Sequence, residues 1–483
     1  MYIHNEDTIY APATVPGTGA ISVIRISGPD ALTIADKVIT CRRGSISDAA
    51  GYTIRFGTAV SPSGETIDEV LVSVFRAPHS YTGENSVEIS CHASSFIVTT
   101  LMGMLSAAGA RAAEPGEFTQ RAYLNGKMDL AQAEAVADVI ASQNAAAHRI
   151  AFKQMKGGFS SELKDMRSEL LELVSLMELE LDFSEEDVEF ADRSRLDSLL
   201  VKITEHVTRL IDSFRLGNAI KNGVPVAIAG ATNTGKSTLL NALLGEDRAI
   251  VSDIHGTTRD TIEETLNIDG ILFRFIDTAG LRETSEVVEK IGIERTFKKI
   301  SEASIVLGMV DLTRDSETTC ETVRSIIEAV DFKTQKLVFL LNKTDISNTN
   351  KFVITKNIIV SEIEKQSVAH IDICNIEKYL EIIPMSAKTG TGVSELRSIL
   401  ASSQKNLLAE SDTTLVTNQR HVQALTDART SLLRVREGLA SGLPSDLAAQ
   451  DIREAIYHLG SIVGEISTDE VLGNIFANFC IGK

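Results

Sequence analysis

The sequence predicts a multidomain protein: an α+β N-terminal domain, an all-α helical domain that is discontinuous in sequence, and an inserted α/β domain. Three observations lead to this fold class. The chain has 483 residues, too many for one hydrophobic core. Along the chain, short β-type runs are followed by helical patterns, and then by apolar strands that alternate with helices. Helical sequence returns after the α/β part, so we expect one helical domain split by an insertion.

The first part of the chain, residues 1–122, is predicted to be an α+β domain. Short apolar or alternating runs lie between Gly, Pro and Ser residues, as is typical of strands. The runs are AISVIRISG, GYTIRFGTAV, EVLVSVFRAP and NSVEISCH.

Helical sequence is predicted over residues 123–217. An alanine-rich helix starts after Asp129, where Gln132 completes a capping box, and is expected to end at Gly157-Gly158. Two more helices are expected, near 159–182 and 193–216. The first of the two is strongly acidic, and its charge run is interpreted as a solvated face.

The segment GNAIKNGVP is interpreted as a polar linker into an α/β domain at 218–400. Near-continuous apolar strands separated by helical patterns predict a parallel sheet covered on both faces. The strands are VPVAIAG, ILFRFID, SIVLGMVD, KLVFLLN and EIIPMSA. Residues 401–483 are predicted to be helical again, and the region 346–380 suggests no mechanism.

Charge and composition restrict the classes of function. The formal net charge of −19 excludes a broadly basic nucleic-acid binder, so a local patch or a partner would have to hold any RNA. The five cysteines form no C-x-x-C pair, which indicates a reducing compartment and no structural zinc. Because the N-terminus has no signal-peptide pattern and no apolar run is long enough to span a bilayer, we expect a cytoplasmic protein without a membrane anchor.

A phosphate-binding loop is predicted at Gly230-Ala-Thr-Asn-Thr-Gly235-Lys236-Ser237, which fits G-x-x-x-x-G-K-[ST] between a strand and a helix. Glycines let backbone N–H groups surround the phosphates. Lys236 would reach the outer phosphates, and Ser237 would bind Mg²⁺.

Three further motifs follow apolar strands and indicate guanine. Asp277 ends a strand where a metal shell needs a carboxylate, and Gly280 lets the backbone approach the γ-phosphate. Asp345, in Asn342-Lys343-Thr-Asp345, can accept the paired N–H donors of guanine, which adenine lacks. Ser386-Ala387-Lys388 can support the base. These motifs together predict a GTP-binding enzyme.

The residue after Gly280 is Leu281, where many GTPases place a glutamine that orients water. Charge and positioning must therefore come from elsewhere. Asn233 and the stretch 255–260 are candidates, because asparagine and backbone carbonyls can hold a monovalent cation. The alternative is that Asn233 is a loop residue that bonds its own backbone.

The chain ends on FCIGK. A prenylation signal does not fit, because Gly482 is not aliphatic and Lys483 is not a recognised final residue. The plain alternative is a frayed helix end with a buried, apolar Cys480.

From end to end, the chain resembles the tRNA modification GTPase family called MnmE or TrmE. The stretches that carry the resemblance are NEDTIYAPAT, PGTGAISVIRISGP, HSYTGENSVEISCH, PGEFTQRAYLNGKMDLAQAEAVADVI, GTTRD, DTAGLRET, VEKIGIER, NKTD, SAKTGTGV and FCIGK. The resemblance implies a homodimer of three-domain chains. Each chain would have an N-terminal domain similar to folate-binding one-carbon enzymes, a split helical domain and an inserted Ras-like P-loop GTPase domain.

The resemblance assigns roles to the matching residues of the GTPase site. In place of an arginine finger, K⁺ would be held by Asn233, Ser252, Ile254 and Thr257. Mg²⁺ would be held by Ser237 and Thr258. Glu289 would orient the attacking water, unless it is only an exposed helix glutamate.

The catalytic residues that the resemblance implies are Glu289, Lys236 and Cys480. The implied GTP-binding residues are Asn233, Thr234, Gly235, Lys236, Ser237, Thr238, Ser252, Asp253, Ile254, His255, Gly256, Thr257, Thr258, Asp277, Thr278, Ala279, Gly280, Asn342, Lys343, Asp345, Ser386, Ala387 and Lys388.

The resemblance also implies a site for 5-formyl- or 5,10-methylene-tetrahydrofolate, formed by Arg25, Glu84, Lys127 and Lys483. Glu84 could accept the amide and amine edge of the pterin, while basic groups suit the carboxylates of the glutamate tail. In that case Lys483 supplies charge, Gly482 lets the tail bend inward, and Cys480 is a candidate for the one-carbon chemistry.

The implied function is that of a K⁺-stimulated GTPase with an MnmG-type, FAD- and NADH-dependent partner in a heterotetramer. It would add a carboxymethylaminomethyl or aminomethyl group to C5 of the wobble uridine of certain tRNAs. The alternatives are a GTP-switched ribosome-assembly factor and a regulatory GTPase that signals through its helices. One departure from the family is Ala231-Thr232, where proline usually precedes the asparagine, so we expect altered loop stiffness with binding retained.

Overall fold

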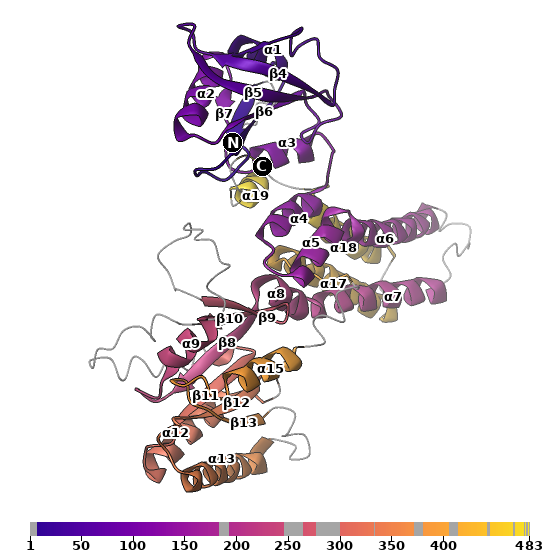
Figure 1. The fold of residues 1–483 in the computed structure, drawn as a ribbon. Helices are drawn as coiled ribbons and strands as arrows, with labels where there is room; N and C mark the ends of the chain where they lie inside the picture. The colour runs from indigo at the N-terminus through magenta and orange to yellow at the C-terminus, as the bar shows by residue number, and fades with distance from the viewer. Residues whose placement is uncertain are drawn as a thin grey trace. The chain divides into compact units, whose positions relative to one another are not determined.

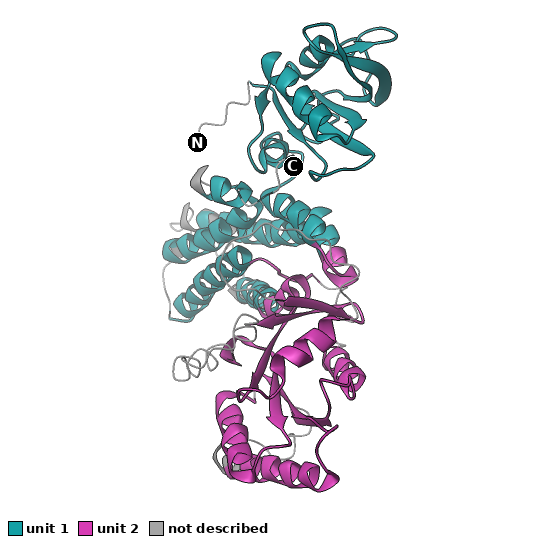
Figure 2. Ribbon diagram, turned by 60° about the vertical axis from the view of Figure 1, so that its left-hand side comes forward, with its two compact units in different colours: residues 1–141, 151–211, 419–483 teal, residues 142–150, 212–418 magenta. Residues whose placement is uncertain are grey.

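The computed structural model describes residues 7–182, 193–245, 264–276, 300–332, 334–370, 380–404, 414–441, 445–466, 469–477, 479 and 482. Figure 1 shows its helices and strands, which form the two compact units coloured in Figure 2. One unit comprises Met1–Ala141, Ala151–Ile211 and Gln419–Lys483, and the other Ser142–Ile150 and Asp212–Asn418. The predicted fold class is confirmed, with a sheet-based N-terminal part, a discontinuous helical part and an inserted α/β part. The domain boundaries at residues 122, 217 and 400 stay predictions.

A seven-stranded sheet in the order β3-β4-β5-β6-β2-β1-β7 forms the N-terminal part. All neighbours are antiparallel except β1 and β7, which run parallel. The strands are β1 (Ile9–Pro12), β2 (Ile21–Ser27), β3 (Ile39–Cys41), β4 (Thr53–Val60), β5 (Thr66–Phe75), β6 (Ser86–His92) and β7 (Arg111–Ala112). The sequence predicts β2, β4, β5 and β6, but not the other three, which are too short to show a period.

The two faces of this sheet differ in what they pack against. Helices α1 (Ala31–Val38) and α2 (Ser95–Ala107) pack with buried residues of one face, such as Ile24 and Ile26. Because side chains alternate along β2, Arg25 and Ser27 belong to the opposite face. The residues opposite them on β1 are Ala11 and Ile9, which cluster with Phe118 of α3 (Glu117–Leu124). Polar side chains therefore lie beside a small apolar cluster at α3.

The helical part begins with the predicted capping box, which is confirmed. The N–H of Gln132 donates to Asp129 Oδ1, and the N–H of Asp129 donates to Gln132 Oε1, both at 2.9 Å. The prediction of one helix that ends at Gly157-Gly158 is wrong, because the chain leaves the helix after Ala141. Asn144 Oδ1 accepts from the N–H of Ala147 at 2.8 Å, which starts a separate helix. The two helices are α4 (Leu130–Ala141) and α5 (Ala145–Met155).

Segments far apart in sequence pack together in the helical part. Helix α18 contacts both α17 and α6, and α4 contacts α18. The helices besides α4 are α6 (Gly158–Asp182), α7 (Arg193–Asp212), α17 (Gln419–Ala440), α18 (Ser445–Val463) and α19 (Asp469–Phe476). In the described part of the chain, none of the helices is long and apolar enough to span a bilayer.

The prediction of a linker at GNAIKNGVP is wrong for its first part, which lies in helix α8 (Phe214–Asn222). Ile220 of this helix is buried in the core of the α/β unit. A Cβ at Gly217 would lie 2.2 Å from the carbonyl oxygen of Val416, so α8 packs closely against the returning chain. This segment resembles a linker in sequence because several of its residues are polar. It is a helix with one narrow buried face, formed by Gly217 and Ile220.

The α/β unit contains a six-stranded sheet in the order β13-β12-β11-β8-β10-β9. The strands are β8 (Val224–Gly230), β9 (Glu264–Ile268), β10 (Ile271–Ile276), β11 (Ile305–Asp311), β12 (Lys336–Asn342) and β13 (Leu380–Pro384). The predicted parallel strands are confirmed, but the antiparallel edge strand β9 is not predicted by the sequence.

Two separate apolar clusters lie against this sheet, which confirms that both of its faces are covered. Helices α9 and α15 contribute to one cluster, and α12 and α13 to the other. Their bounds are α9 (Lys236–Leu244), α12 (Ser316–Ala329), α13 (Thr349–His370) and α15 (Val393–Ser403). Helix α13 accounts for most of the region 346–380.

The polar ends of the parallel strands meet at one edge of the sheet. Gly230 ends β8, Asp311 ends β11 and Asn342 ends β12, while Ser386 follows β13 closely. In open α/β sheets, ligands bind outside the carboxyl ends of the strands. The predicted nucleotide motifs therefore lie where this architecture favours a site.

Candidate functional site

The loop between β8 and α9, residues 230–237, has the backbone conformation of a phosphate-binding loop. Asn233 and Gly235 have φ values of 61° and 100°, in the left-handed region. A Cβ at Gly235 would lie 2.5 Å from Asn342 Nδ2, so this position requires glycine. Helix α9 begins at the next residue, and the N-terminal N–H groups and the dipole of a helix favour an anion at this end. The loop therefore offers a backbone site for phosphate.

Lys236 lies inside its own loop. Its Nζ donates to the carbonyl oxygens of Gly230 and Ala231 at 2.8 and 2.9 Å. Burial lowers the pKa of Lys236, and the charge of Arg314 lowers it further. Because an anionic oxygen is a stronger acceptor than a carbonyl, the ammonium group can exchange these bonds for one to a phosphate.

Asn342 joins three of the predicted segments. Its buried side chain donates from Nδ2 to the carbonyl oxygen of Thr234 at 2.7 Å, and its Oδ1 accepts from the N–H of Ala387 at 2.9 Å. Ser386 Oγ donates to Asp345 Oδ1 at 2.8 Å and so orients a carboxylate that is otherwise exposed. The structure thus brings the phosphate loop, the Asn342–Asp345 segment and the Ser386–Lys388 segment together.

Asp311 is a candidate residue that none of the predicted motifs includes. Its Oδ2 lies 2.6 Å from Nζ of Lys343, and its Oδ1 accepts from the N–H and Oγ1 of Thr313 at 2.9 and 2.7 Å. Burial alone would raise the pKa of Asp311, but the bonds from Lys343 and Thr313 outweigh burial and lower it. The available signal was its place at the end of an apolar strand, the same signal that identifies Asp277.

Much of the predicted nucleotide site lies outside the described residues. This applies to Ser252, Asp253, Ile254, His255, Gly256, Thr257, Thr258, Asp277, Thr278, Ala279, Gly280 and Glu289. Ser237 and Thr238 lie in the first turn of α9, and Lys388 is exposed in the turn after Ser386.

A second group of predicted residues lies on the N-terminal sheet. Arg25 on β2 is directly opposite Glu88 on β6, and its Nε and Nη2 lie 3.0 and 2.9 Å from Glu88 Oε1. The guanidinium carbon lies 5.2 Å from the ring centroid of Tyr81 and 5.7 Å from that of Phe118. Its Nη1 donates to the carbonyl oxygen of Gly482 at 3.4 Å. Arg25 is thus oriented by a carboxylate, two rings and the C-terminal tail.

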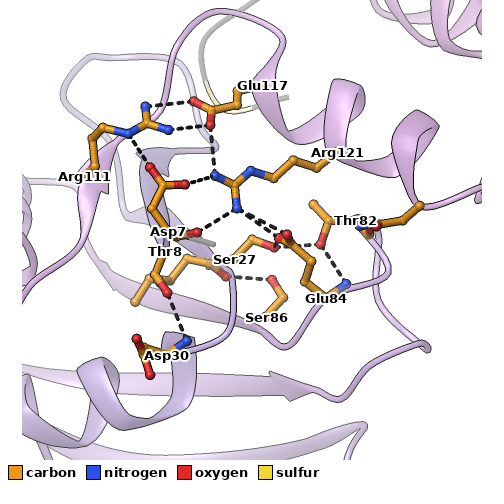
Figure 3. Close-up of polar contacts among 12 residues, drawn as sticks. Asp7, Thr8, Ser27, Asp30, Thr82, Glu84, Ser86, Arg111, Glu117 and Arg121 are labelled. Carbon is orange, nitrogen blue, oxygen red and sulfur yellow. Dashed lines mark hydrogen bonds and ion pairs between the residues drawn. The ribbon is translucent and has the colours of Figure 1, made fainter. Parts of the chain in front are cut away.

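Both carboxylate oxygens of Glu84 are bound by neighbouring side chains (Figure 3). Ser27 Oγ donates to Oε2 at 2.7 Å, and Nη1 of Arg121 lies 3.2 Å from Oε1 and 3.4 Å from Oε2. The N–H of Glu84 donates to Thr82 Oγ1 at 3.2 Å. The carboxylate is therefore fixed in orientation and paired with a cation.

Arg121 is fully buried, with Glu84, Asp7 and Glu117 as its anionic partners (Figure 3). Nη2 of Arg121 lies 2.5 Å from Asp7 Oδ1 and 3.0 Å from Glu117 Oε1, and Arg111 binds the same two carboxylates. Burial alone would raise the pKa of Asp7 and of Glu117, but the two arginines outweigh burial and lower both. A buried cation is tolerated only with such partners.

Nothing in the sequence singles out Arg121. Its partners Asp7 and Glu84 are 114 and 37 residues away along the chain, and its nearby partner Glu117 does not by itself predict the network.

The C-terminal tail reaches the N-terminal sheet at Gly482. This residue is buried with φ of 96°, and a Cβ there would lie 2.2 Å from the carbonyl oxygen of Pro12. Upstream, the ring centroids of Phe476 and Phe479 are 5.2 Å apart, and a Cβ at Gly116 would lie 2.6 Å from Phe476 O. The predicted bend at Gly482 is therefore present. Cys480 and Lys483 lie outside the described residues.

Lys127 contacts the segment that carries Glu84. Its Nζ donates to the carbonyl oxygen of Pro78 at 2.9 Å, and its Cγ and Cδ lie 3.4 Å from the position of a Cβ at Gly83. Arg25, Glu84 and Lys127 therefore all lie around residues 78–84.

Comparisons with known proteins place the whole chain in one family. The family description "GTP-binding protein TrmE N-terminus" matches residues 8–127, and "MnmE helical domain" matches residues 130–480. A Bacteroides fragilis protein named tRNA modification GTPase MnmE is 52% identical over 481 residues, which cover 99% of this chain and 100% of that protein. A Flavobacterium johnsoniae protein of the same name is 50% identical over 486 residues, with the same two coverages.

Among solved structures, a variant of Aquifex aeolicus Era bound to GDP·AlF₄⁻ is 25% identical over 43% of this chain and 66% of that chain, with a TM-score of 0.25. The assignment does not depend on that likeness. It depends on the full-length identity above and on the two family descriptions, which agree with the resemblance carried by the sequence motifs. The chain belongs to the MnmE (TrmE) family of tRNA modification GTPases.

Proposed function

We propose that this chain binds and hydrolyses GTP with Mg²⁺ at the carboxyl edge of its α/β sheet. Lys236 and the N–H groups of residues 230–237 would bind the phosphates. Asp345 would accept hydrogen bonds from the paired N–H donors of guanine. Support comes from Asn342, whose side chain bonds both the phosphate loop and the Ser386–Lys388 segment. Ser237 would hold Mg²⁺ together with Thr258 and would thereby neutralise charge on the phosphates.

A potassium ion would supply positive charge beside the phosphates, in place of an arginine finger. Asn233 fits the role of a ligand, because its exposed side chain makes no hydrogen bond to another residue in the part that the structure describes. Its left-handed φ of 61° gives the loop a sharp turn at this residue. Ser252, Ile254 and Thr257 would complete the oxygen set, and Glu289 would orient the attacking water.

The N-terminal part would bind 5-formyl- or 5,10-methylene-tetrahydrofolate, which supplies a one-carbon unit when bound. Glu84 would accept the paired N–H groups of the pterin, and Arg25, Lys127 and Lys483 would face its carboxylates. The observation that carries this proposal is the convergence of Arg25 and Gly482 near a Glu84 carboxylate that Ser27 and Arg121 orient. Cys480 would lie close to the one-carbon chemistry.

The modification itself would need partners. An MnmG-type, FAD- and NADH-dependent protein would form a heterotetramer with a homodimer of this chain in the cytoplasm. Together they would add an aminomethyl-type group to C5 of the wobble uridine, with most tRNA contacts supplied by the partner, since this chain has a net charge of −19. Exposed apolar residues on β4 and β5, namely Ile54, Phe56 and Leu71, support pairing through the N-terminal sheet.

Calorimetric titration of the full chain with 5-formyl-tetrahydrofolate tests the folate part of this proposal. We expect Glu84→Gln to weaken binding by about 100-fold, because the amide cannot accept both pterin donors and leaves Arg121 without one anionic partner. Glu69→Gln is the matched control, since Glu69 is an exposed β-strand carboxylate whose contact with Arg42 is 3.5 Å long. Absence of binding by the parent chain, or equal binding by the parent and Glu84→Gln, would contradict the proposal.

A further inference from the structure

The short connection between β11 and α12, residues 312–315, lies against the phosphate loop. Nη2 of Arg314 donates to the carbonyl oxygen of Thr232 at 2.8 Å. None of the predicted sequence motifs includes this arginine. It is a charged side chain that contacts the residue directly before Asn233.

The backbone that carries Arg314 is anchored on both sides. Asp311 accepts two hydrogen bonds from Thr313, and Asp315 Oδ1 accepts from the N–H of Thr318 as the N-cap of α12. From α13, Nζ of Lys351 donates to the carbonyl oxygens of Thr313 and Arg314 at 3.2 and 3.0 Å. The backbone segment that carries the guanidinium group of Arg314 is therefore held in place by hydrogen bonds on both sides.

The position of the contact determines what it restrains. The carbonyl of Thr232 belongs to the peptide plane that links Thr232 to Asn233. A donor on that oxygen opposes rotation of the plane, and so restrains ψ of Thr232 and φ of Asn233. The left-handed φ of 61° at Asn233 costs free energy for a residue with a Cβ, although less for asparagine than for most residues, and such a bond helps to hold it.

The same side chain adds charge to the site. A permanent cation beside the loop also favours a phosphate anion there.

We propose that Arg314 is a positioning residue of the GTPase site, which holds the Thr232–Asn233 peptide so that Asn233 keeps its left-handed conformation. This inference rests on the proposed nucleotide function. It supplies a reason why this chain has no need of proline at residue 232: proline restrains the loop by fixing its own φ, whereas the bond from Arg314 restrains it from outside.

A double-mutant cycle tests the inference on the full chain. Fluorescence titration with a fluorescent GDP analogue, in Na⁺ buffer, measures binding without hydrolysis or K⁺. Arg314→Ala should weaken binding about fivefold, the effect of losing one ordinary hydrogen bond at an exposed position. Arg324→Ala is the matched control, because this exposed arginine of α12 has its described partners, Glu362 and Cys320, outside the phosphate loop.

The Thr232→Pro background distinguishes two effects of Arg314→Ala: loss of the restraint on the phosphate loop and loss of the positive charge beside it. The N–H of Thr232 donates no hydrogen bond to another described residue, so proline removes none there. In the Thr232→Pro background, Arg314→Ala should weaken binding less than about twofold, because the ring already restrains the loop. In GTP turnover, Arg314→Ala should also raise the K⁺ concentration that gives half the maximal rate.

Two results would overturn the inference: no effect of Arg314→Ala in the parent chain, or the same fold-loss in the parent and Thr232→Pro backgrounds. Failure of the proposed function has a different signature, since the parent chain itself would then not bind the analogue.

Discussion

The buried ion cluster that joins the two halves of the helical part gives a quantitative prediction. Glu134 of α4 lies 2.8 Å from Nη2 of Arg420 and 2.7 Å from Nε2 of His421, and both partners are on α17, after the α/β insertion. Burial alone would raise the pKa of Glu134, but His421 and Arg420 outweigh burial and lower it from 4.5 to about 2. We predict that Glu134→Gln weakens the attachment of α4 to α17.

The size of the effect follows from the pKa of Glu134. A shift of this size corresponds to about 3 kcal/mol of stability at neutral pH. Because Glu134 is almost fully enclosed, solvent screening reduces this figure little. The folded pKa lies below the unfolded one, so the contribution is complete above about pH 4.5 and is lost as the pH falls toward 2.

Hydrogen exchange measured by mass spectrometry is a suitable assay, because a chain of several domains does not unfold in two states. At neutral pH, amides of α4 and α17 should exchange about 100-fold faster in Glu134→Gln than in the parent chain. Glu169→Gln is the control, since Glu169 forms an exposed pair with Lys202 and should change little. Equal protection of α4 and α17 in Glu134→Gln and in the control would refute the reasoning.

Two further predictions concern the two candidate sites. Gly482→Ala places a Cβ 2.2 Å from Pro12 O at a left-handed φ, so the tail must shift at a cost of about 1–3 kcal/mol. Limited proteolysis should then cleave the tail faster and folate binding should weaken, whereas unchanged cleavage would show that the tail is not held there. Asn342→Ala removes the bonds to Thr234 and Ala387 and leaves two buried backbone groups without their partner, so GDP-analogue affinity should fall about tenfold or more. The control is Asn348→Ala, which loses only an exposed bond to the N–H of Lys351, and equal affinity of the two variants would contradict the bridging role of Asn342.

The sequence predicted the parts of the fold whose information is local. The apolar strands VPVAIAG and KLVFLLN, each followed by a polar motif, locate the phosphate loop and Asn342 at one sheet edge. The capping box at Asp129 and Gln132 is equally local, and both of its hydrogen bonds form.

The wrong predictions concern segments whose secondary structure depends on tertiary contacts. Alanine-rich sequence lies on both sides of residues 142–144, but the Asn144 side chain caps a new helix and donates to the carbonyl oxygen of Ile220. The polar segment of α8 is helical because Ile220 is buried in the core of the α/β unit. Arg121 and Arg314 could not be identified, because Asp7 and Glu84, which pair with Arg121, and Thr232, which accepts from Arg314, are distant in sequence and only the folded chain brings them near.

The most direct test of the central claim is the rate of GTP hydrolysis by the full chain in K⁺ and in Na⁺ at equal ionic strength. We predict that turnover is much faster in K⁺, and that Asn233→Ala removes most of this difference without abolishing binding of the GDP analogue. Equal rates of the parent chain in the two salts, or no GTP hydrolysis in either, would contradict this prediction.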